Sequence, residues 1–171
     1  MVRMKNTKYS SQVAGAFTLI ELLVVISIIA ILAGMVMPMV YSAKERAREA
    51  KTRVAAKELE IAFKSYLDTY KVWPPEFVDG PLNGDIFRIM CGQNVNNSAN
   101  PQLIAFYEFE STNTLVANDS WLNPYQVWFD RDYDNKITIG GLDAYRCVVV
   151  WSPGKLGDDD SGGGDDVASW K

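Results

Sequence analysis

The chain has 171 residues, a formal net charge of −4 and no histidine. Without histidine the commonest general base and metal ligand is missing, which excludes most Ser-His and Cys-His catalytic schemes. No cluster of basic residues forms the footprint of a nucleic-acid-binding protein, and the paired carboxylates lie in a glycine-rich segment rather than among apolar residues. We therefore expect neither nucleic-acid binding nor enzyme activity.

The first predicted element is a membrane helix over residues 17–40. No charged residue occurs from Leu22 to Val40, and an α-helix of this length is about as long as a bilayer core is thick. The preceding residues 1–16 form a short polar leader that ends in small residues. Because basic residues favour the cytoplasmic side, we expect a cytoplasmic N-terminus and a periplasmic remainder; these residues are Arg3, Lys5 and Lys8.

Glu21 lies near the start of this apolar run. A charged side chain costs about 2.5–3.5 kcal/mol at the centre of a membrane helix and less near its end. Two interpretations stay open. Glu21 reaches the membrane interface, or it awaits a positive partner, for which the best candidate is a new α-amino group released by cleavage upstream, on a neighbouring subunit.

The segment from Ala16 to Val25 resembles the N-terminal signature of type IV pilins and type II secretion pseudopilins. The resemblance implies that prepilin peptidase cuts before Phe17 and methylates its new amine, and that Glu21 pairs with such an amine during assembly. The family usually has Gly before the cut, whereas here Ala16 follows Gly15. We favour cleavage after Ala16 because it keeps the spacing from Phe17 to Glu21, with cleavage after Gly15 as the alternative.

An amphipathic helix half is predicted over residues 41–72, because apolar residues recur there at three- and four-residue steps. We expect one long helix from Phe17 to about Tyr70. Pro38 falls where many pilins carry a helix-bending proline, and it predicts a kink or local melting. Pro74 and the residue after it stop the helix.

A variable connecting region is predicted over residues 73–118. It contains one expected helical turn at 85–90 and a short helix or strand at 103–110. In pilin-like proteins the region after the helix varies between members and often carries subunit contacts.

Residues 119–171 are predicted to form an antiparallel sheet and an acidic, glycine-rich loop. Residues 125–129 and 136–139 read as a hairpin around 130–135, and 144–151 as a third strand. The predicted fold class is therefore α+β, with a long N-terminal helix packed on a small C-terminal antiparallel sheet. The segment from Asp119 to Tyr125 is similar to the Asp-x-Trp-Gly-x-Pro-Tyr motif of major pseudopilins, with Leu122 in place of the Gly.

Two acidic clusters are candidates for calcium. The first begins like an EF-hand loop, but Gly141 stands where the bidentate Glu should be, so we interpret it as a hairpin tip. Its members are Asp130, Asp132, Asp134 and Asn135.

The second cluster lies in the C-terminal loop and contains Asp158, Asp159, Asp160, Asp165 and Asp166. Flexible loops rich in carboxylates and glycine suit Ca²⁺, which takes 6–8 oxygen ligands. The resemblance points the same way, because the C-terminal loop of major pseudopilins binds calcium. Asp166 matches one calcium ligand of the family. The position of a second family ligand, an Asp, falls near Lys155 or Leu156 here, so Asp158 or its neighbours would have to supply that ligand instead. A solvated acidic loop is the alternative.

Cys91 and Cys147 would form one disulfide outside the cytoplasm, or else remain two buried thiols.

Together these features predict a pseudopilin, a structural subunit of a pilus-like filament of a type II secretion system. It would be a single-pass protein of the bacterial inner membrane before assembly. Its partners would be further copies of itself, other pseudopilins, prepilin peptidase and the inner-membrane assembly platform. The alternatives are a minor pilin of a type IV pilus, serving adhesion, motility or DNA uptake, and a membrane-anchored calcium-dependent binding domain.

Overall fold

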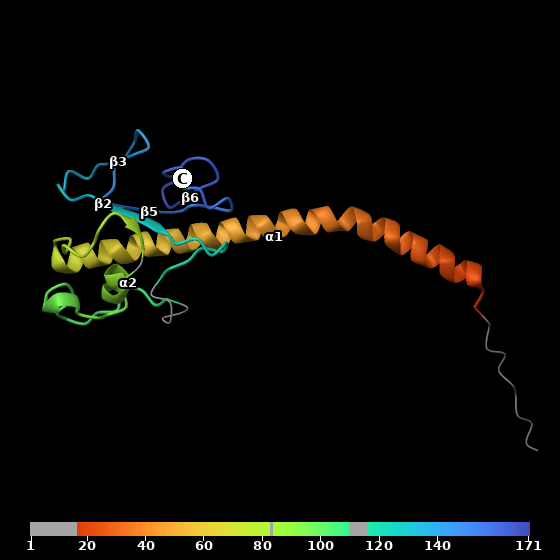
Figure 1. Cartoon of the computed structure of the whole chain (residues 1–171), viewed down its shortest axis with the longest axis horizontal. Helices are drawn as coiled ribbons and strands as arrows, with labels where there is room; N and C mark the ends of the chain where they lie inside the picture. Colours follow the sequence, from red (N-terminus) through yellow and green to blue (C-terminus); the bar gives the residue numbers. More distant parts are fainter. Residues whose placement is uncertain (1–16, 83, 110–115) are drawn as a thin grey trace, which may run out of the picture. The chain divides into compact units, whose positions relative to one another are not determined.

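The computed structural model describes residues 17–82, 84–109 and 116–171, and the chain divides into two compact units, Met1–Ala43 and Lys44–Lys171. The leader predicted at 1–16 lies outside the described residues, and so do Gly15 and Ala16. The longest element is helix α1, Leu19–Tyr70, which contains residues of both units (Figure 1).

Within the first unit, α1 exposes apolar side chains on all sides. Leu22, Ile26 and Ile29 are each more than half exposed, as expected for a surface that faces lipid or other helices. The helix is long and apolar enough to cross a membrane. It continues through Pro38, so the predicted local melting is not formed, and the proline removes one backbone hydrogen bond to the carbonyl of Gly34. A kink at Pro38 stays a prediction.

The second unit contains the remaining elements. A four-stranded antiparallel sheet has the order β1-β2-β5-β6, and a separate ribbon pairs β3 with β4. The bounds are β1 Gly80–Pro81, β2 Gln126–Phe129, β3 Ile137–Ile139, β4 Leu142–Ala144, β5 Val148–Ser152 and β6 Val167–Ala168, with helix α2 at Gly84–Met90 and a 3₁₀ helix, η1, at Val95–Asn97.

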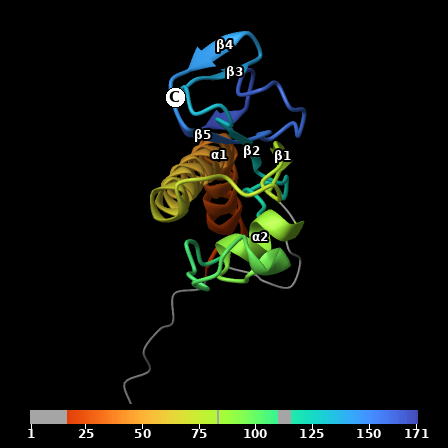
Figure 2. The same cartoon turned by 90° about the vertical axis from the view of Figure 1, so that its left-hand side faces the viewer.

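Strand β5 is buried on both faces and divides the core in two. On one face Val148 and Val150 pack in a cluster with the buried stripe of α1, which includes Leu59 and Phe63. On the other face Val149 and Trp151 pack with residues of β3, β6 and the C-terminal segment. The helices therefore cover one face of the sheet, and the β3–β4 ribbon covers the other (Figure 2).

The predicted hairpin between 125–129 and 136–139 is wrong. Strand β2 pairs with β5, from Gln126 opposite Trp151 to Phe129 opposite Val148. Strand β3 pairs with β4 instead, across a turn in which Gly140 and Gly141 have φ of 55° and 79°. Two adjacent residues with positive φ suit a tight two-residue hairpin turn, whereas the seven residues between β2 and β3 are too many for such a turn.

Two further expectations concern the connecting region. The turn expected at 85–90 is helix α2. The described part of 103–110 contains neither a helix nor a named strand, only an isolated bridge between Ala105 and Cys91.

The disulfide is not formed. Cys91 and Cys147 are free thiols. Cys91 directly follows α2, and Cys147 lies just before β5, where its carbonyl accepts a hydrogen bond from the Asp130 N–H. Burial raises the pKa of both thiols, which lowers their reactivity.

Candidate functional site

The N-terminus of α1 is capped by three hydrogen bonds that Thr18 and Glu21 form with each other. The Thr18 backbone N–H and hydroxyl donate to Glu21 Oε2, at 2.8 and 2.7 Å. The Glu21 N–H donates back to Thr18 Oγ1 at 3.3 Å. This arrangement is a capping box, in which residue N-cap and residue N3 satisfy each other's backbone donors.

The capping box fixes the Glu21 carboxylate but occupies only one of its oxygens. Among the described residues none donates a hydrogen bond to Oε1, and Phe17 next to the box is 74% exposed. The predicted cleavage positions Gly15 and Ala16 lie outside the described residues. Glu21 can therefore accept a further donor through Oε1 without breaking the helix cap.

A second constellation holds the segment from Asp119 to Tyr125. Asp119 Oδ1 accepts from the backbone N–H groups of Trp121 and Asn123, at 2.8 and 2.9 Å, and its Oδ2 accepts from the Ser152 hydroxyl. Asn123 Nδ2 donates to the Gly154 carbonyl at 2.8 Å. We call this group, Asp119, Asn123, Ser152 and Gly154, the Asp119 clamp; it ties the turn before β2 to the turn after β5.

Leu122 stands inside this turn at the position where the resembling motif has Gly. Its φ is 72° and its side chain is 80% exposed. A non-glycine residue in this left-handed region costs roughly 1–2 kcal/mol, and glycine does not bear that cost.

Leu122→Gly is expected to stabilise the second unit by up to about 1 kcal/mol, because relief of backbone strain exceeds the added entropy of the unfolded chain. The free energy of unfolding, from urea titration of the full chain in detergent micelles, measures the effect. Leu156→Gly is the matched control: Leu156 is 73% exposed and its φ is not positive, so this change should destabilise. Equal losses from both changes would contradict the strain argument.

The C-terminal acidic loop brings together three of its five predicted carboxylates. Oxygens of Asp160, Asp165 and Asp166 lie within 4.8 Å of one another. Asp159 is used elsewhere, because its Oδ1 accepts from the Trp151 indole and the Ser161 N–H, both at 2.9 Å. Asp158 is exposed and lies outside the cluster.

The three clustered carboxylates fit an oxygen-coordinated cation. Asp165 Oδ1 and Asp166 Oδ1 are buried without a hydrogen-bond partner, although their second oxygens accept from the N–H groups of Leu156 and Gly162. Burial, together with nearby Asp159 and Asp160, raises the pKa of Asp166 to about 6. Gly164 allows the close approach, since a Cβ there would lie 2.0 Å from Asp160 Oδ2.

The structure also adds residues that the sequence analysis missed. Thr18 was not assigned a role, although the spacing of Thr18 and Glu21 is the sequence pattern of a capping box. Asn123 was noted only as part of the segment from Asp119 to Tyr125, and Ser152 was not singled out. No local signal reveals that the partner of Ser152 lies 33 residues away in the chain and that of Asn123 31 residues away.

Comparison with family models found one match. Residues 13–37 match the prokaryotic N-terminal methylation motif. Searches of curated proteins and of solved structures found no match to the chain. The matched range contains the Thr18–Glu21 capping box and all of the apolar run but its last three residues, and the motif implies processing by prepilin peptidase and pilin-like assembly. The chain thus carries, at its N-terminus, the signature of type IV pilins and pseudopilins.

Proposed function

We propose that this protein is a major-pseudopilin-like subunit of a type II secretion filament. Prepilin peptidase cleaves after Ala16 and methylates Phe17, and the subunit stays in the inner membrane until it is assembled. The observation that carries the proposal is the N-terminal methylation motif with Phe17 and Glu21 four residues apart.

The capping box supports the assembly role of Glu21. A carboxylate whose Oε2 is already held by Thr18 is oriented before a partner arrives, so less entropy is lost when Oε1 accepts the methylated amine of a neighbouring subunit. In an apolar fibre core a charge-assisted hydrogen bond is stronger than in water, and an unpaired charge is costly.

The Asp119 clamp and the acidic loop favour the secretion system over a type IV pilus. The clamp uses the Asp and Asn of the segment similar to the major-pseudopilin motif, and it contacts the Ser152–Gly154 turn. We propose that Asp160, Asp165 and Asp166 hold calcium in the loop after this turn. Bound calcium would neutralise the carboxylates and fasten the loop beside β6.

The test is the intact mass and N-terminal residue of the protein purified from membranes of cells that contain a prepilin peptidase. A chain that starts at Phe17 and is heavier by one methyl group is the expected result. Cells lacking the peptidase provide the control and should yield the uncleaved chain. An uncleaved N-terminus in the presence of active peptidase would overturn the proposal.

A further inference from the structure

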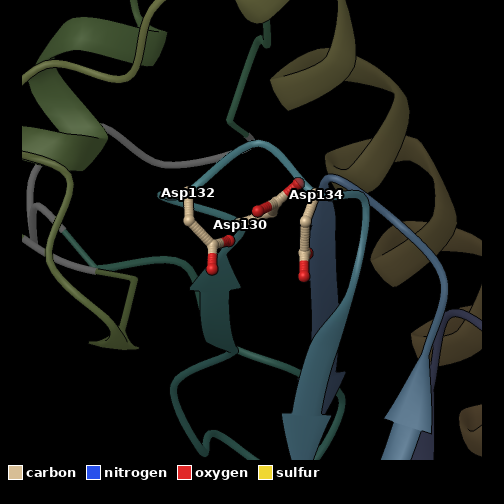
Figure 3. A group of neighbouring side chains, drawn as sticks. All are labelled: Asp130, Asp132 and Asp134. Carbon is tan, nitrogen blue, oxygen red and sulfur yellow. The ribbon is translucent and has the colours of Figure 1, made fainter.

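The loop between β2 and β3 carries a second group of three carboxylates, separate from the C-terminal loop. Asp130, Asp132 and Asp134 offer oxygens that lie within 4.8 Å of one another (Figure 3). Asp132 and Asp134 are exposed, whereas Asp130 is only 3% exposed. Among the described residues no lysine or arginine forms a salt bridge with any of the three, because nearby Lys136 pairs with Asp143.

Asp130 is held rigidly at every polar group but one. Its backbone N–H donates to the Cys147 carbonyl at 3.0 Å, and its carbonyl accepts from the Trp73 indole at 2.9 Å. Its Oδ2 accepts from the Asn135 N–H at 2.8 Å. Its Oδ1 is buried and has no hydrogen-bond partner. Such an orphaned carboxylate oxygen is costly, and it calls for a ligand or an ion.

The ligand atoms and the solvent exposure of the cluster indicate which kind of cation it would bind. The three side chains offer only oxygen, the ligand preferred by hard cations, and two of them are open to solvent, which leaves room for water ligands. Flexible loops with several carboxylates suit Ca²⁺ better than Mg²⁺, which demands near-ideal octahedral geometry.

We propose that Asp130, Asp132 and Asp134 form a site for a calcium-like divalent cation in the β2–β3 loop. Asp130 Oδ1 is the preorganised ligand, and the two exposed aspartates complete the carboxylate set. This segment is not the tip of a hairpin, because the two strands that it joins do not pair with each other. Its backbone is hydrogen-bonded to Trp73 and Cys147. The ion would lock this connection between the end of α1 and the sheet, independently of filament assembly.

Calorimetric titration of the metal-free full chain in detergent micelles with CaCl₂ tests the site. Asp132→Asn is the primary variant, because Asp132 is exposed and its change leaves the fold intact. It should remove one equivalent of bound calcium or weaken that binding step at least tenfold. Asp130→Asn should do the same. Asp85→Asn is the matched control, since Asp85 is exposed and forms a salt bridge with Arg88, and its isotherm should equal that of the wild type.

Asp166→Asn separates this site from the C-terminal loop. In that background the β2–β3 site should still bind one equivalent, and adding Asp132→Asn should abolish it. Terbium should report the same step, because Tyr133 lies in the loop, the Trp73 indole donates to the Asp130 carbonyl, and both rings can sensitise terbium emission. The proposal is overturned if Asp166→Asn leaves no calcium binding, or if Asp132→Asn changes neither stoichiometry nor affinity.

Discussion

Glu21→Leu is expected to abolish filament assembly while leaving the protein in the membrane. The change removes a charge from the apolar run, which favours insertion. On the proposed function, it would also leave the methylated amine of the neighbouring subunit without a partner in an apolar core. Removing one partner of a buried ion pair costs about 3–5 kcal/mol, which weakens association roughly 100- to 4000-fold per contact. Filaments sheared from cells and quantified by immunoblot measure the loss, with the membrane fraction as reference.

Two further changes make this result specific. Ser27→Ala is the matched control, because the Ser27 hydroxyl donates to the Val24 carbonyl of its own helix and its removal should leave assembly intact. Thr18→Val keeps the Glu21 charge but removes one arm of the capping box. It should reduce filaments partly, in line with about 0.5–2 kcal/mol for a lost helix cap. Normal filaments from Glu21→Leu would contradict the assembly role of the carboxylate.

Phe63→Ala is expected to lower the free energy of unfolding of the second unit by about 3–5 kcal/mol, as for other buried aromatic residues. Phe63 is fully buried, and its ring contacts Phe77 and Phe129 edge-on, with centroids 5.7 and 5.3 Å away. These rings belong to the segment after α1 and to β2, so the truncation opens a cavity where helix and sheet meet. Urea titration of the full chain in micelles, followed by tryptophan fluorescence, gives the loss.

Ile61→Ala provides the control from the same turn of α1. Ile61 is 62% exposed, and its truncation should change the free energy of unfolding by no more than about 0.5 kcal/mol. A loss below about 1 kcal/mol for Phe63→Ala would show that this part of the core collapses to refill the space.

The sequence was informative wherever the determinants are local. The uncharged run and the three- and four-residue spacing of Leu59, Phe63 and Tyr66 predict α1 to within two residues of its observed ends. The spacing of Phe17 and Glu21 indicates the N-terminal signature in the same way. The Thr18 partnership was equally local and could have been predicted.

The strand pairing and the membership of the acidic cluster could not be predicted, because both depend on contacts between segments that are distant in the sequence. From the sequence pattern alone, β2 could pair with β3 or with β5. The observed pairing with β5 depends on the burial of the β5 valines on both faces of the sheet, which is a property of the folded protein. In the acidic loop five aspartates look equivalent. Trp151 removes Asp159 from the cluster through a hydrogen bond that only the folded sheet creates.

The position of β6 sets the order in which the protein matures. Strand β5 completes its pairing only with Val167 and Ala168, and the Ser169 N–H closes the edge with a bond to the Val150 carbonyl. The residues of α1 leave the ribosome long before these do. The sheet therefore cannot close until residue 169 has been synthesised, and during that interval the edge of β5 that pairs with β6 stays open although β2, its partner on the other edge, has already been made. Chaperone binding to β5 during synthesis would be the natural protection against aggregation.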